Sequence, residues 1–146
     1  MSGTTDYGLQ YTYDTNTNLV GYSDVDWAGC IDDRNSTLGG AFYVGNNLVA
    51  WHNKKQNCVS LSTAKAESVA AKSCCTQLMW MKQILSAYGI SQSTFLVYCD
   101  NMSAIDISKN HVQHSRTKQI DIRHHFIRDL VEAKILTLNL CQLKNN

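Results

Sequence analysis

The stretch Leu19-Val-Gly-Tyr-Ser-Asp-Val-Asp-Trp-Ala-Gly29 combines strand-forming residues with acids. Val20, Tyr22 and Trp27 favour a β-strand. Because strand side chains alternate between two faces, Asp24 is predicted to share a face with Val20 and Tyr22. A carboxylate on an apolar face is costly unless it is paired or binds a metal. The stretch therefore predicts either a site at Asp24 or, alternatively, a strand end with solvated acids.

The composition is that of one globular domain. The chain has 146 residues, 44% hydrophobic and 17% charged, with a formal net charge of +1. This length allows a sizeable core. With a net charge near zero, any nucleic-acid-binding surface must be a local basic patch. No apolar run could span a membrane, no secretory signal is visible, and the six cysteines lack metal-ligand spacing. We expect an intracellular protein, cytoplasmic or nuclear and not secreted, with reduced cysteines.

Strand patterns surround the opening stretch. Residues 8–13 alternate like a strand. Leu38–Val44 and Leu48–His52 also read as strands, and Gly45-Asn46-Asn47 between them predicts a hairpin.

A helical pattern follows from Ser62. Apolar residues recur at intervals of three or four, which predicts a helix with one face toward the core. The stripe consists of Glu67, Ala71, Cys74, Leu78, Met81 and Leu85. Ser60 or Ser62 can cap the helix, and Gly89 ends it. Glu67 heads the inward stripe; the alternative is an acid that bends out to solvent.

The second half predicts a buried parallel strand, two helices and a last strand. Phe95–Asp100 is a short apolar run that ends in an acid. Residues 101–108 suggest a short helix, Arg116–Lys134 a long one, and Ile135–Leu140 a final strand. The order predicts an α/β fold with a mixed sheet.

Three acids are each predicted to lie at or near the sheet, in a strand, on the inward face of a helix or at a strand end. They are Asp24, Glu67 and Asp100. Clustered carboxylates repel one another, and divalent cations such as Mg²⁺ or Mn²⁺ relieve that repulsion. Such clusters serve two-metal hydrolysis of phosphodiesters. Spacing alone leaves open whether the three acids meet.

Five motifs resemble the ribonuclease H domain of copia-type retrotransposon Pol polyproteins. They are Leu-Val-Gly-Tyr-Ser-Asp-Val-Asp-Trp-Ala-Gly-Cys (19–30), Ser-Thr-Ala-Lys-Ala-Glu-Ser (62–68), Ser-Cys-Cys-Thr-Gln-Leu-Met-Trp-Met-Lys-Gln (73–83), Tyr-Cys-Asp-Asn-Met-Ser-Ala-Ile (98–105) and the segment from His114 to Asp129. Gly-Thr-Thr-Asp-Tyr-Gly-Leu (3–9) resembles the connection from reverse transcriptase to that domain. The resemblance implies two units: a connection remnant over residues 1–18 and, over residues 19–146, a ribonuclease H-like domain lacking its C-terminal end.

The resemblance also implies an activity. It implies a five-stranded mixed sheet flanked by helices and cleavage of the RNA strand of RNA–DNA hybrids. Two Mg²⁺ ions, which Mn²⁺ can replace, are implied at Asp24, Glu67 and Asp100. We expect a monomer with an RNA–DNA hybrid as partner and no membrane contact, separated from the reverse transcriptase and integrase of the parent polyprotein.

The chain also departs from the family pattern. The family's fourth acid follows the last strand, whereas no Asp or Glu follows Glu132 here. The usual acid at position 65 is Lys65, and an aromatic position is Ser68. The alternative function is therefore a catalytically dead remnant, at most a nucleic-acid-binding module.

Other residues are weaker candidates. Basic and polar residues that could contact the nucleic acid are Lys54, Lys55, Asn101, Ser103, Arg116 and Lys118. For any one of the basic residues, a solvated surface position is the alternative. Asp26 is predicted to be a turn or surface acid rather than a ligand, and His124 and His125 to serve helix packing or the surface.

Overall fold

The computed structural model describes residues 8–13, 16–26, 36–55, 63–100 and 118–141. These described residues form five strands and two helices. In chain order they are β1 (Leu19–Asp26), β2 (Thr37–Val44), β3 (Asn47–Lys55), α1 (Thr63–Ala87), β4 (Phe95–Cys99), α3 (Lys118–Glu132) and β5 (Leu136–Leu140). The helix predicted at 101–108 and the caps at Ser60 and Ser62 lie outside the described residues.

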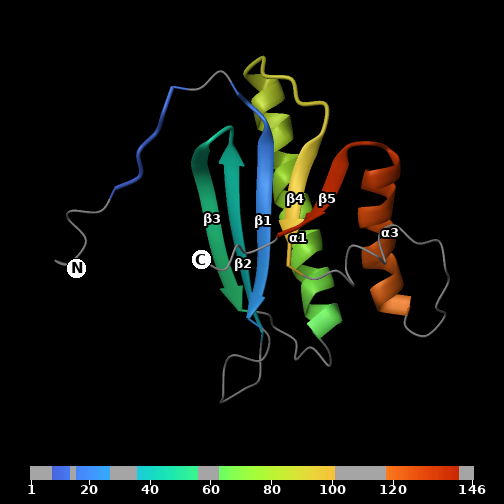
Figure 1. Cartoon of the computed structure of the whole chain (residues 1–146). Helices are drawn as coiled ribbons and strands as arrows, with labels where there is room; N and C mark the ends of the chain where they lie inside the picture. Colours follow the sequence, from blue (N-terminus) through green and yellow to red (C-terminus); the bar gives the residue numbers. More distant parts are fainter. Residues whose placement is uncertain (1–7, 14–15, 27–35, 56–62, 101–117, 142–146) are drawn as a thin grey trace.

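The strands form one mixed sheet in the order β3-β2-β1-β4-β5. The pairs β1–β2 and β2–β3 are antiparallel, whereas β1–β4 and β4–β5 are parallel. Figure 1 shows β1 in the middle of the sheet, with α1 running beside it in the opposite direction. The predicted α/β class and the mixed sheet are confirmed.

The core lies between one face of the sheet and the two helices. Strand residues that alternate inward, such as Leu19, Phe42 and Val97, are buried in one cluster with helix residues from α1 and α3. The inward stripe predicted for α1 is confirmed, since its members from Glu67 to Met81 are buried.

Two glycines end elements as their sequence positions predict. Gly45 has φ of 60° at the first position of the two-residue turn between β2 and β3, as a type II′ hairpin turn requires. Gly89 has φ of 80°, and the Ile90 N–H donates to Leu85 O at 2.9 Å. This is the bond of a Schellman motif, which satisfies a carbonyl at the end of α1.

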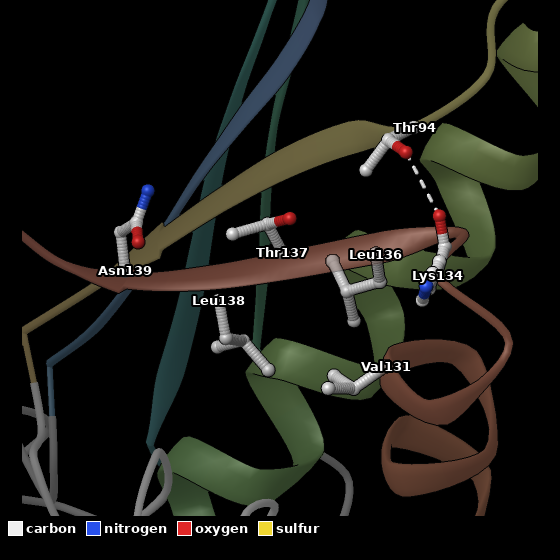
Figure 2. A pocket seen from close by; sticks show the side chains of 7 residues that line it. All are labelled: Thr94, Val131, Lys134, Leu136, Thr137, Leu138 and Asn139. Carbon is white, nitrogen blue, oxygen red and sulfur yellow. Dashed lines mark hydrogen bonds between the residues drawn. The ribbon is translucent and has the colours of Figure 1, made fainter.

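The same motif ends α3, but with a lysine at the left-handed position. Lys134 has φ of 56°, and the Ile135 N–H donates to Leu130 O at 2.9 Å. The Thr94 hydroxyl donates to Lys134 O at 2.8 Å, which ties the α3–β5 turn to the start of β4 (Figure 2). Both residues line a cavity of about 430 Å³ beside β5.

The strand predicted at residues 8–13 is wrong, because this segment is not part of the sheet. Its backbone instead bonds a side chain: the Thr12 N–H donates to Asn47 Oδ1 at 2.8 Å, and Asn47 Nδ2 donates to Thr12 O at 3.0 Å. The alternating residues Tyr11 and Tyr13 are exposed, so the alternation in this segment does not correspond to a buried strand face.

Among the helices that the structure describes, none has a stretch long and apolar enough to cross a membrane.

Candidate active site

Asp24 lies near the end of β1 and, as predicted, on the face that Val20 and Tyr22 share. The predicted cost of burial there is wrong, because this is the open face: Tyr22 is 39% exposed and Asp24 is exposed. The opposite face, with Leu19 and Ser23, packs against α1. Asp24 Oδ1 accepts a hydrogen bond from the Val25 N–H at 2.8 Å, which orients the carboxylate.

Asp100 follows the last residue of β4 and is exposed. The parallel register pairs Tyr22 with Tyr98 and Ser23 with Cys99. Asp24 and Asp100 are therefore the next residues on two adjacent strands, which lie about 4.8 Å apart. Carboxyl ends of neighbouring parallel strands are the usual place for ligands in α/β sheets.

Glu67 faces this strand end from the beginning of α1. Its side chain is only 7% exposed, so the alternative of an acid bent into solvent is wrong. Its Oε2 atom is buried and has no hydrogen-bond partner among the described residues. An unsatisfied buried oxygen is costly, and it marks a place where a ligand can supply the missing partner.

The electrostatics show that the three acids are neighbours. Burial and then the negative charges of Asp100 and Asp24 raise the pKa of Glu67 to about 7, and a hydrogen bond with Asp100 acts in the same direction. Without a cation, Glu67 is therefore about half protonated near neutral pH. A positive ion at this place would favour the ionised form of all three carboxylates.

The donor set fits a hard divalent cation, since it consists of carboxylate oxygens and includes an unsatisfied one. In the described part of the chain, no group of three or more His, Cys, Asp or Glu side chains is arranged to hold a metal ion. Asp24, Glu67 and Asp100 therefore interact through their charges but do not stand as a formed ligand set, and their role as metal ligands stays a prediction.

Two buried hydroxyls beside the acids were missed by the sequence analysis. Ser23 is 5% exposed and Ser68 is 1% exposed, and neither Oγ atom has a hydrogen-bond partner among the described residues. Ser23 precedes Asp24 and Ser68 follows Glu67, so both lie at the seam between β1 and α1. Strand alternation places Ser23 on the face opposite Asp24, and from this pattern the burial of Ser23 could have been predicted.

The predicted nucleic-acid contacts are only partly placed. Lys54 and Lys55 end β3 and are exposed. Lys118 begins α3, with its side chain outside the description, and Asn101, Ser103 and Arg116 lie outside the described residues. On α3, His125 is exposed, in agreement with the predicted surface role and not with a role in helix packing.

The cysteines support the predicted structural role where they are described. Cys74, Cys75 and Cys99 are buried thiols in the core. Burial raises the pKa of Cys74 to about 12 and raises that of Cys75 as well. Such thiols are not ionised near neutral pH, so they are poor nucleophiles and poor metal ligands.

The solved structures similar to this one define the class of fold. An RNase H1 from Halobacterium salinarum NRC-1 has a TM-score of 0.57 at 11% identity, over 84% of each chain. LC11-RNase H1 in complex with an RNA/DNA hybrid has a TM-score of 0.61 at 12% identity, over 88% of each chain. The protein therefore has a ribonuclease H-like fold.

Sequence relatives define the family more closely. A Pol polyprotein from transposon TNT 1-94 of Nicotiana tabacum is 45% identical over 118 residues, and one from transposon RE2 of Arabidopsis thaliana is 37% identical over 137 residues. These stretches cover 81% and 93% of this chain but only 9% of either relative. No protein-family model matches the chain. Its homologues are thus copia-type Pol polyproteins of transposons, as the sequence motifs predict.

Proposed function

We propose that the chain is a ribonuclease H-type hydrolase that cuts the RNA strand of RNA–DNA hybrids with two Mg²⁺ ions, or with Mn²⁺ in their place. Asp24, Glu67 and Asp100 would hold the ions. The observation that carries the proposal is the meeting of the three acids: Asp24 and Asp100 follow paired positions on adjacent parallel strands, and Glu67 presents a buried oxygen with no partner among the described residues. The negative charges of Asp100 and Asp24 add to burial in raising the pKa of Glu67. Support comes also from the fold, because one of its structural neighbours was solved with an RNA/DNA hybrid.

Divalent cations at this place would supply the Lewis acid chemistry that phosphodiester hydrolysis needs, by polarising the phosphate and making water a better nucleophile. The chain's own residues supply position and charge. The Val25 N–H engages one oxygen of Asp24 and leaves the other for a ligand. Glu67 contributes its buried, unsatisfied Oε2 atom, and Asp100 reaches the site from the end of β4.

A cleavage assay on an RNA–DNA hybrid in Mg²⁺ or Mn²⁺ tests this function. Asp24→Asn, Glu67→Gln and Asp100→Asn should each reduce the rate by at least about 100-fold, because even outer-shell partners of a metal are worth 10–100-fold. Asp129→Asn is the matched control. This acid is exposed on α3, so its loss of charge should leave cleavage unchanged. Hybrid binding without cleavage at any metal concentration would reject the enzyme and favour a binding-only remnant.

A further inference from the structure

The two edges of the sheet differ in how well they are protected against pairing with another strand. β3 forms one edge and β5 the other. An edge strand offers a row of N–H and C=O groups to any further strand, and proteins block such pairing with charges or bulges. β3 has both, since it ends in Lys54 and Lys55 and its register with β2 shifts once. β5, with the sequence Leu-Thr-Leu-Asn-Leu, has no charge and a regular register with β4. It is therefore the edge that a further strand can approach.

The hydrogen bonds between β4 and β5 show which backbone groups of β5 face outward. The Phe95 N–H donates to Ile135 O at 3.0 Å, and the Cys141 N–H donates to Cys99 O at 2.7 Å. Because the direction alternates along a strand, the odd-numbered residues from 135 to 141 turn their backbone polar groups toward β4. The even-numbered residues of β5 turn theirs away from the sheet, where no described strand lies. These residues are Leu136, Leu138 and Leu140.

A cavity of about 430 Å³ opens along this edge, beside β5 and the end of α3. Figure 2 shows Leu136 and Leu138 on the side of β5 that faces Val131, with Thr137 and Asn139 on the other side. A strand added to β5 would lie beside this cavity and could place apolar side chains against its lining. Strand addition commonly combines backbone hydrogen bonds with such pockets for alternate side chains.

A second copy of β5 fits this edge, because the strand is self-complementary about Leu138. In an antiparallel pair centred on this residue, Leu138 lies opposite Leu138 of the second copy, and Leu136 lies opposite Leu140. Every outward-facing residue thus meets another outward-facing residue, and each such pair can exchange both N–H···O bonds. Contacts of this kind are made by the same patch on both subunits, which a two-fold axis requires. The axis also brings the cavities of the two copies together.

The charges near β5 do not oppose this pairing. Thr137 and Asn139 lie opposite one another across the axis, at positions where side chains come closest, and both are neutral. The nearest charge before β5 is Lys134, four residues from the centre. The two copies of Lys134 would be about 26 Å apart at 3.3 Å per residue, well beyond the Debye length of about 8 Å.

We propose that two copies of the chain associate by antiparallel pairing of β5 with β5, which joins their sheets into one. A contact between five-residue strands is smaller than standard stable interfaces, which bury about 1,600 Å². We therefore expect a weak dimer with a dissociation constant of about 100 µM. The pairing does not involve the three acids, so it is independent of the proposed function. It replaces the monomer expected from the sequence, in which the strand order of the sheet is not visible.

Sedimentation equilibrium at about 10–500 µM tests the dimer with charge variants on the outer side of β5. Thr137→Lys/Asn139→Lys sets like charges opposite one another across the axis, which destabilises a strand pair. Thr137→Lys/Asn139→Glu is the matched control, because it changes the same positions but sets each lysine opposite a glutamate. The dissociation constants of the two variants should differ at least about 10-fold, with the Lys/Glu variant the tighter.

Mixing the variants tests the antiparallel register. Thr137→Lys/Asn139→Lys and Thr137→Glu/Asn139→Glu should associate with each other, although neither associates alone. Circular dichroism confirms that each variant is folded. A wild type that stays monomeric at about 500 µM would overturn the proposal and leave the edge to a different partner. A dimer that the Lys/Lys variant leaves intact, or equal loss in the Lys/Lys and Lys/Glu variants, would also overturn it.

Amide hydrogen exchange of the wild type identifies the paired strand without any substitution. Between about 20 and 500 µM protein, exchange of the Leu138 and Leu140 amides should slow about threefold as the dimer forms. The Thr137 and Asn139 amides face β4 and should exchange at the same rate at both concentrations. Association without this alternating pattern would place the interface elsewhere and overturn the proposal.

Discussion

Burial and two neighbouring carboxylates disfavour the ionised form of Glu67, which makes the stability of the protein depend on pH. The pKa of Glu67 is raised from 4.5 in the unfolded chain to about 7 in the folded protein. The folded state therefore binds more protons between these values. In the metal-free protein the contribution of Glu67 is fully present below about pH 4.5 and is lost as the pH rises through about 7.

Glu67→Gln should remove this loss. In EDTA at pH 8 we expect the variant to be more stable than wild type by about 3 kcal/mol, since the pKa rise from 4.5 to about 7 is worth about 1.4 kcal/mol per unit. At pH 4 the two proteins should be equally stable in this respect, because both side chains are then neutral. Urea unfolding across pH 4–8 measures the difference. A gap that does not change with pH would show that burial and the two neighbouring acids do not raise the pKa of Glu67.

Lys134 is the second residue whose conformation carries a cost. A left-handed φ costs a non-glycine residue about 1–2 kcal/mol, and here it is held by the α3–β5 turn. Lys134→Gly should stabilise the protein by about 1 kcal/mol. Lys134→Ala is the control, since it removes the side chain but keeps the strain. Thermal unfolding of both variants separates the two effects, and equal melting temperatures would contradict the backbone explanation.

Between elements, the decisive contact is the seam where α1 crosses β1 at Gly21. A Cβ atom on Gly21 would lie 2.7 Å from Leu78 Cδ1 and 2.8 Å from Cys74 Sγ. Because both side chains are buried, they have little room to move. The absence of a side chain at Gly21 therefore sets how closely α1, and with it Glu67, approaches the sheet.

Gly21→Ala should destabilise the protein by about 1–3 kcal/mol through overpacking and should reduce hybrid cleavage by displacing Glu67. Gly39→Ala on the neighbouring strand is the matched control. There the nearest atoms to a new Cβ are 3.8 Å away, an ordinary contact, so little loss is expected. Denaturant unfolding and cleavage rates give both readouts. An equal loss in the two variants would mean that the strand glycines matter only for backbone propensity.

Sequence patterns predict the elements wherever the buried side chains recur at the regular interval of a strand or a helix. The alternation in Phe95–Cys99 and the stripe from Ala71 to Met81 predict their elements because each side chain packs on one shared core. The segment 8–13 fails for the same reason, since its alternation buries nothing and its backbone bonds an Asn side chain. The face of Asp24 could not be settled from β1 alone, because which face is covered depends on where α1 lies.

The candidate site was only partly predictable. The three acids follow from their element ends, and their proximity follows from the register of β1 and β4. The burial of the Ser23 and Ser68 hydroxyls depends on packing between elements distant in sequence. No local pattern contains that information.

At the scale of the whole molecule, cation binding should couple to folding, because the acids come from three separate elements and meet only in the folded state. At pH 8, Mg²⁺ at 100 times its dissociation constant should stabilise the wild type by about 2.7 kcal/mol. Asp24→Asn should abolish most of this shift. The shift should shrink at pH 6, where protons compete for Glu67. Differential scanning calorimetry with and without Mg²⁺ measures it, and a shift that survives in Asp24→Asn would place the ion elsewhere.

The position of β1 between an antiparallel and a parallel neighbour also sets the order in which the chain can fold. β2 and β3 are joined by a two-residue turn, and β1 pairs with β2, so these strands can assemble early from nearby segments. The pairing of Val20 with Leu96 must wait for a far longer chain closure, and long-range pairing is the slow part of folding. Asp24 and Asp100 become neighbours only in that step. During refolding we therefore expect catalytic activity to return with the slowest kinetic phase, after most of the sheet signal has recovered.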